Sequence, residues 1–100
     1  AAEQAVLEKP GSYEANFVLG ISYRKLKRFA DAEKALIKAA KTASPQSPDV
    51  HWNLALLYYQ DLKKNKEAAK ELETWLKLSP EAPNKEDVKK LIQRLKETAQ

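Results

Sequence analysis

A spacing of about 35 residues recurs in this chain of 100 residues, and it limits the folds that the chain can form. Pro10, Pro45 and Pro80 are 35 residues apart both times. Other types of residue repeat at 35 or 36 residues: Leu19 with Leu54, Gly20 with Ala55, Tyr23 with Tyr58, Ala32 with Ala68, and Leu36 with Leu72. Unlike residues seldom share one period by chance. The chain therefore contains internal repeats, and a period of this length is typical of stacked supersecondary units.

Within each period the apolar residues have the three- and four-residue spacing of amphipathic helices. This spacing predicts helices at about 12–26, 29–42, 48–61, 65–78 and 85–98. Ser12 and Ser47 precede two of these segments and can cap them, and Pro48 suits a first helical position. Valine and isoleucine never alternate with polar residues over a run, so no strand is predicted. The expected fold class is all-α.

Length and composition restrict the domain organisation and the class of protein. One hundred residues, of which 43% are hydrophobic and 32% are charged, fit one folded domain. No apolar run approaches the roughly 18 residues of a membrane-spanning helix, and no signal peptide is visible. The chain has no methionine, so we expect it to be a piece of a longer protein. Cytoplasm and periplasm are equally compatible with a sequence that contains no cysteine.

The repeated positions resemble the tetratricopeptide repeat family, whose first helix carries tryptophan, leucine-glycine and tyrosine and whose second carries alanine, a large apolar residue and a closing proline. The first unit matches at Leu19, Gly20, Tyr23, Phe29, Ala32, Leu36, Ala39 and Pro45, with Asn16 in the tryptophan position. The second unit matches at Leu54, Ala55, Tyr58, Ala68, Leu72 and Pro80. The resemblance covers residues 12 to 80.

The second unit allows two registers. In one, Trp52 takes the tryptophan position and Leu56 replaces the glycine. In the other, His51 takes the tryptophan position and Ala55 replaces the glycine. We prefer the second, because the glycine position is where the helices approach most closely and leucine would force them apart. This register requires one extra residue, which we expect in the turn "QDLKKNK", since turns accept insertions at little cost.

The resemblance implies a right-handed superhelical array of antiparallel helix pairs, a tetratricopeptide-like α-solenoid. We expect one domain over residues 1–100, with a remnant of a preceding repeat at 1–10, repeats at 12–45 and 48–80, and a capping helix at 84–98. Val18, Leu19, Tyr23, Leu54, Leu57 and Tyr58 are expected between the helices. Gly20 would let the neighbouring helix approach.

Catalysis is disfavoured by the inventory of reactive residues. The chain has one histidine, His51, and no cysteine, which excludes most nucleophile–base pairs and most zinc sites. Glycine-rich phosphate loops are absent. We therefore predict that the protein is not an enzyme and that it needs no cofactor or metal.

The family binds proteins or peptides through a concave groove lined by the first helix of each unit. On that resemblance, the partner-binding groove is predicted to contain Phe17, Ile21, Arg24, Lys25, Trp52, Asn53, Leu56 and Tyr59. The apolar members suit an apolar or amphipathic peptide or helix. A carboxylate clamp is disfavoured, because Phe17 and Ile21 occupy positions where it would need polar residues. Two alternatives to ligand binding remain open: the apolar stripe is covered by other repeats, or it pairs with a second copy of the chain.

A second candidate surface is basic. Lys27, Arg28, Lys63, Lys64 and Lys66 surround the turns inside the two units, which a stacked array places along one edge. This edge could bind an anionic partner such as an acidic protein, a membrane surface or a nucleic acid. Cations at helix C-termini also complement the helix dipole. No aromatic residues alternate with these cations in the manner of nucleic-acid binders, so nucleic acid is the disfavoured partner.

Overall fold

The structure is a computed structural model that describes residues 12–43 and 47–98. Its α-helices are α2 (Tyr13–Lys25), α3 (Phe29–Thr42), α4 (Pro48–Leu56), α5 (Asn65–Leu78) and α6 (Lys85–Thr98), and a π-helix, η1 (Leu57–Asp61), continues α4. No strand occurs in these two ranges. The all-α prediction is confirmed, whereas the predicted remnant at 1–10 lies outside the described residues.

Two serines begin helices in different ways. The Ser12 side chain accepts a hydrogen bond from the backbone N–H of Ala15 at 3.0 Å, so it caps α2 as predicted. Ser47 precedes α4 without making a side-chain capping bond. Its Oγ instead accepts a hydrogen bond from the Tyr13 hydroxyl at 2.7 Å. Ser47 therefore links the start of α4 to α2, and the prediction that it caps α4 is wrong.

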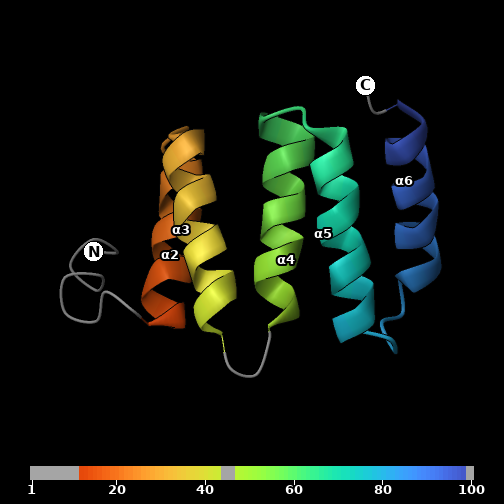
Figure 1. Cartoon of the computed structure of the whole chain (residues 1–100), viewed down its shortest axis with the longest axis horizontal. Coiled ribbons are helices and arrows are strands. Elements are labelled where there is room, and N and C mark those ends of the chain that lie inside the picture. Colours follow the sequence, from red (N-terminus) through yellow and green to blue (C-terminus); the bar gives the residue numbers. More distant parts are fainter. Residues whose placement is uncertain (1–11, 44–46, 99–100) are drawn as a thin grey trace.

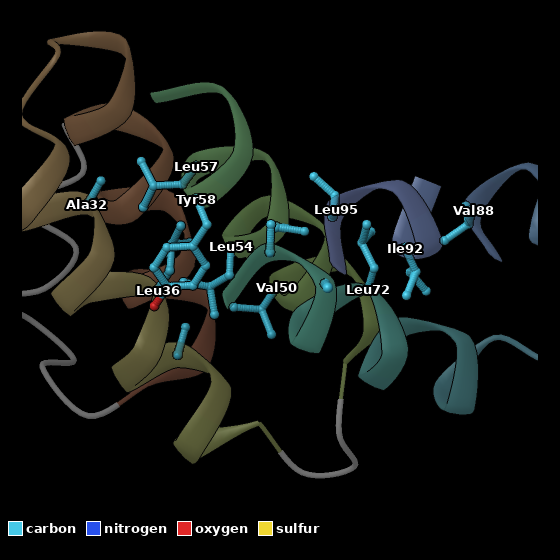
Figure 2. Packing of buried hydrophobic residues seen from close by; sticks show 14 residues of the cluster. Ala32, Leu36, Val50, Leu54, Leu57, Tyr58, Leu72, Val88, Ile92 and Leu95 are labelled. Atoms are coloured by element: carbon cyan, nitrogen blue, oxygen red, sulfur yellow. The ribbon is translucent and has the colours of Figure 1, made fainter. Parts of the chain in front are cut away.

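The helices stand side by side in chain order, and successive helices run in opposite directions (Figure 1). One cluster of buried residues runs through the array, with Leu36 on α3, Leu54 on α4, Leu72 on α5 and Ile92 on α6 (Figure 2). Each of the three leucines is at most 3% exposed. Burial of one such side chain contributes about 1.5–3 kcal/mol. Because each helix shares the cluster with its neighbours, contacts between adjacent elements hold the array together.

Gly20 marks a close approach between α2 and α3. A Cβ atom at this position would lie 2.6 Å from both Cγ and Cδ2 of Leu36 and 3.3 Å from the Leu36 backbone nitrogen. Leu36 is fully buried, so it has little room to move. The structure confirms that the glycine allows the neighbouring helix to approach. In the second unit, Leu54 and Ala55 are each 2% exposed and Leu56 is half-buried, as the preferred register requires.

The extra residue of the second unit lies inside a helix. The backbone N–H of Leu62 donates to the carbonyl of Leu57 at 2.9 Å, five residues earlier, which is a π-helical bond. The turns that follow have equal lengths: Lys27 is two residues before α3 begins, and Lys63 is two residues before α5 begins. Both lysines have left-handed backbones, with φ of 63° and 56°. The extra residue is therefore taken up by η1, which includes the first two residues of the stretch "QDLKKNK", and the turn that follows η1 has no insertion.

The prediction that Val18 belongs to the core is also wrong, because its side chain is 49% exposed. An α-helix advances about 100° per residue, so Val18 is about 200° around α2 from Gly20. Gly20 faces α3, and Val18 therefore points away from that helix. About half of the Val18 side-chain surface is therefore left open by the described residues.

One face of α6 closes the far end of the described array. Val88, Ile92 and Leu95 are buried against the core cluster. Two polar contacts tie the same helix to α5: Lys96 Nζ lies 3.0 Å from a carboxylate oxygen of Glu73, and the Asn65 amide donates to Thr98 Oγ1 at 2.9 Å. The face away from α5 consists mainly of exposed charged residues, including Lys89, Lys90, Arg94 and Glu97. This amphipathic pattern fits the proposed capping role.

Candidate functional site

A pocket of about 310 Å³ opens between the first unit and the start of the second. It is lined by the end of α2, the following turn, α3, α4 and the end of η1. The lining residues are Ile21, Arg24, Lys25, Lys27, Phe29, Leu36, Asn53 and Asp61. Four of them, Ile21, Arg24, Lys25 and Asn53, belong to the predicted groove, and Lys27 belongs to the predicted basic edge. The pocket thus brings parts of both candidate surfaces together.

Three apolar side chains form the inner lining of this pocket: Ile21, Phe29 and Leu36. Leu36 is fully buried and packs against Gly20, so it closes the pocket from within the core and exposes no surface of its own. Phe29 packs against the core cluster and is half-buried. The accessible apolar lining therefore comes from Ile21 of α2 and Phe29 of α3.

An ion pair between the two units forms part of the pocket wall. Arg24 Nε donates to an Asp61 carboxylate oxygen, and Arg24 Nη2 donates to Gln60 Oε1 at 2.8 Å. The side chains of Arg24 and Asp61 are 27% and 19% exposed, so the pair is largely shielded from water. Charge-assisted hydrogen bonds in such a setting are stronger than those between neutral groups. Arg24 therefore links α2 to η1.

Lys25 and Lys27 differ from Arg24 in having no carboxylate partner among the described residues. Both side chains are exposed at the rim of the pocket. Asn53 lies across the pocket on α4, and its side-chain amide donates to the Asp49 carbonyl at 2.9 Å. The rim thus combines two unpaired ammonium groups with one amide that is held in place by its own helix.

The remaining predicted groove residues lie outside the pocket lining. Phe17 stacks on Tyr13 with ring centroids 5.5 Å apart, and it also packs against the core cluster. Trp52 lies 5.0 Å from Trp75 of α5, measured between ring centroids. These two aromatic residues therefore have structural contacts of their own, in addition to any contact with a partner.

Leu56 and Tyr59 are the more accessible groove candidates on the second unit. Leu56 is half-buried, and Tyr59 is 39% exposed, although it is a large aromatic residue. Neither belongs to the core cluster of the described residues. Together with Ile21, they provide apolar surface that the internal packing leaves partly uncovered.

The cations of the predicted basic edge differ in whether they contact other side chains of the protein. Arg28 pairs with Asp31 at 2.9 Å and lies over the ring of Tyr23, 4.5 Å from its centroid. Lys63, Lys64 and Lys66 are exposed and have no ion-pair partner among the described residues, but they lie outside the pocket. Lys27 and Lys63 occupy equivalent turns, yet only Lys27 lines the pocket.

Sequence reasoning missed Phe29, Leu36 and Asp61 as pocket residues. The 16-residue separation of Gly20 and Leu36 across one helix pair could have indicated that the two meet. Nothing in the sequence marks Asp61, because its position depends on the π-helix. The extra residue of the second unit indicates an insertion near this position but does not show that Asp61 reaches the pocket.

Two partly buried polar contacts serve the packing of the array. The Tyr58 hydroxyl of η1 donates to Glu33 of α3 at 2.8 Å. Burial of the phenol, followed by this hydrogen bond and the negative charge of Glu33, raises the pKa of Tyr58 well above its usual range. His51 Nδ1 lies 2.8 Å from Glu71 Oε1, which joins α4 to α5. In the described ranges no group of three acidic, histidine or cysteine side chains is arranged to hold a metal ion.

The helix pairs of this molecule stack through one shared core. Apolar and charged residues of their first helices remain accessible. These two features define a helical-repeat scaffold. Within the described residues, every helix is too short or too polar to cross a membrane. The tetratricopeptide repeat family model matches the chain twice, over residues 1–48 and 28–83. The chain belongs to this family, whose members generally act as non-catalytic modules for protein–protein interaction. Searches of curated proteins and of solved structures gave no significant match.

Proposed function

We propose that the surface formed by α2, α4 and η1 binds an apolar or amphipathic segment of a partner protein without catalysing a reaction. The observation that carries this proposal is the pocket between the two units, which four of the predicted groove residues help to line. Ile21, Leu56 and Tyr59 extend the apolar surface along both units. Partly uncovered apolar surface of this kind is typical of interaction sites.

The pairs Phe17–Tyr13 and Trp52–Trp75 refine the choice of residues for a test. Truncation of Phe17 or Trp52 would remove packing as well as any partner contact, so a loss of binding would have two explanations. Ile21 is the better target, because it lines the pocket without belonging to the core cluster of the described residues. Leu26 provides a matched control: it lies on the same stretch of chain, is 67% exposed, and is not a lining residue.

The test begins with selection of peptides from a library of random 12-residue segments displayed between folded flanks, using the protein itself as bait. Calorimetry then gives the Kd of selected peptides for the wild-type protein, Ile21→Ser and Leu26→Ser. We expect Ile21→Ser to weaken binding at least tenfold, as for an anchor contact at the centre of an interface, and Leu26→Ser to change it less than twofold.

Circular dichroism of each variant verifies that the helices remain formed. The proposal is contradicted if the library yields no binding peptide, or if the two variants bind the selected peptides equally well. Light scattering over a range of concentrations tests the alternative of self-association. A dimer that competes with the selected peptides would mean that the same surface pairs with a second copy.

A further inference from the structure

The chemistry of the pocket restricts its occupant more closely than the predicted groove does. Its volume of about 310 Å³ is at the lower end of the ~300–1,000 Å³ found for small-molecule sites. The accessible apolar lining comes from Ile21 and Phe29, with the fully buried Leu36 beneath them. Every charged lining residue comes from the end of α2, the turn after it or the end of η1. A pocket with these dimensions and this lining suits one apolar side chain that enters from the rim.

The rim carries positive charge that the fold itself does not neutralise. Arg24, Lys25 and Lys27 line the pocket together with one carboxylate, that of Asp61, which leaves a net charge of +2. Arg24 and Asp61 pair with each other, so the excess charge belongs to the two lysines. Both lysines are exposed, and neither has a carboxylate partner among the described residues.

Asn53 adds a hydrogen-bonding group on the opposite side. Its amide nitrogen donates to Asp49, which holds the side chain against α4. Its amide oxygen accepts no hydrogen bond from the described residues and can accept one from a peptide N–H. The pocket thus has an apolar interior, a cationic rim and a hydrogen-bond acceptor, the Asn53 amide oxygen, in a fixed position. These features are complementary to a peptide that has an apolar residue next to an acidic one.

We propose that the pocket takes one apolar side chain of a partner segment, and that an adjacent Asp or Glu side chain of this segment pairs with Lys25 and Lys27. This inference rests on the proposed function and specifies the class of segment that is bound. A phosphate or nucleic-acid backbone would satisfy the lysines but would leave the apolar lining in contact with water. An uncharged apolar segment would fill the pocket but would leave both ammonium groups unused.

The two turns of the molecule provide a matched test of this inference. Lys25→Glu/Lys27→Glu reverses the charge at the pocket, and Lys63→Glu/Lys64→Glu makes the same change in net charge at the equivalent turn away from it. Lys27 and Lys63 share the left-handed backbone conformation, so each variant places one glutamate in that conformation. Peptides selected by the wild-type protein are synthesised with acetylated N-termini and amidated C-termini, so that only side-chain carboxylates are present.

We expect the selected peptides to be enriched in Asp or Glu next to Leu, Ile or Phe. Calorimetry should show at least a tenfold weaker Kd for Lys25→Glu/Lys27→Glu and less than a threefold change for Lys63→Glu/Lys64→Glu. A peptide in which lysine replaces the acidic residue should bind the first variant more tightly than it binds the wild-type protein. That reversal of preference would identify the two lysines as the partners of the carboxylate.

Other outcomes would overturn the inference. If the peptides lack acidic residues, or if Lys25→Glu/Lys27→Glu binds as the wild-type protein does, the pocket does not select a carboxylate. The proposed function would still stand in that case if Ile21→Ser abolished binding. If both double variants lose affinity equally, the whole basic edge attracts the peptide and the pocket has no special role. If no peptide is selected, both proposals fail.

Discussion

The two helix pairs of this molecule have the same turn but different helices leading into it. In the first unit, the backbone N–H of Arg28 donates to the carbonyl of Tyr23 at 2.9 Å. In the second, the N–H of Lys64 donates to the carbonyl of Tyr58 at 2.7 Å, over a span that is one residue longer. The equivalent bond is therefore kept, and the additional residue lies within the span that it closes, in the part that belongs to η1.

This comparison shows which part of the repeat is the more constrained. The turn must place a left-handed lysine and reverse the chain so that the second helix packs on the first. A π-helical turn, in contrast, disturbs only a few hydrogen bonds of the preceding helix. It also changes the direction of the residues that follow it, and Asp61 at the end of η1 reaches Arg24 of the first unit. The insertion is thus associated with a contact between units.

The largest expected effect concerns the contact between Gly20 and Leu36. Leu36→Ala should lower the free energy of unfolding by about 2–5 kcal/mol, because it leaves a cavity in a fully buried site. Gly20→Ala alone should also destabilise, by about 1 kcal/mol, because overpacking against Leu36 outweighs the better helix propensity of alanine. Urea denaturation followed by circular dichroism measures both changes.

The double variant Gly20→Ala/Leu36→Ala sharpens this test. Without the leucine side chain, the new methyl group has space, so the substitution at Gly20 should become stabilising by about 0.5–1 kcal/mol. Additive effects of the two substitutions would mean that their side chains do not compete for the same space, and the explanation of the glycine would be wrong. In the second unit the equivalent position already holds Ala55, which is 2% exposed.

The next prediction compares deletions in the two units. Deletion of Gln60 should convert η1 into ordinary α-helix and cost only about 1 kcal/mol, since it removes the exposed Gln60–Arg24 hydrogen bond and alters the Arg24–Asp61 contact. Deletion of Lys25 should cost on the order of 3 kcal/mol, because the first unit has no extra residue to lose and the turn would be pulled out of register. Denaturant titrations of the two deletion variants test the difference.

Equal costs for the two deletions would contradict the comparison of the units. In that case η1 would contribute as much to stability as the last turn of α2. The second unit would then depend on its extra residue in order to fold. A variant that keeps the insertion but removes the charge, Asp61→Asn, distinguishes the contribution of the ion pair from that of the helix geometry.

The outcome for η1 also shows what could be predicted from the sequence. Helix positions follow from the apolar spacing, which the sequence contains directly, and the family follows from Leu19, Gly20 and Tyr23 recurring as Leu54, Ala55 and Tyr58. The location of an insertion depends instead on the relative free energies of two backbone geometries, a longer turn and a π-helix. Nothing in the residue types of 57–66 decides between them.

The candidate site was predictable to a smaller extent. The resemblance to the family indicated Ile21 and Lys25, because it assigns the groove to one face of the first helix and helical spacing then gives the residues of that face. The exposure of Val18 could not be foreseen, since it depends on which neighbours a helix has. The pairing of Arg24 with Asp61 was equally inaccessible, because it depends on the direction that η1 gives to its last residue. Contacts between units thus require the three-dimensional arrangement.

Alkaline pH should weaken the contact between the units. The pKa of Tyr58 is raised in the folded protein, so the unfolded chain loses the phenolic proton first, near pH 10. The contribution of this group to stability is therefore fully present below pH 10 and declines above it, by up to about 1.4 kcal/mol per pH unit. Urea titrations between pH 9 and 11 measure this decline. Tyr58→Phe should show a shallower dependence on pH than the wild-type protein, and equal slopes would contradict the assignment to Tyr58.

The smallest expected effect tests whether the two turns are energetically alike. Lys27 and Lys63 have φ of 63° and 56°, a conformation that disfavours residues with a Cβ and suits glycine at the position after a helix. Lys27→Gly and Lys63→Gly should each raise the free energy of unfolding by about 0.5–1 kcal/mol, since relief of the strained backbone exceeds the entropy that glycine adds to the unfolded chain. Thermal and urea denaturation of both variants give the two values. Similar gains would mean that η1 accommodates the whole insertion and that the two turns are equally strained. A clearly larger gain at Lys63 would contradict this, because it would mean that the extra residue adds strain to the second turn.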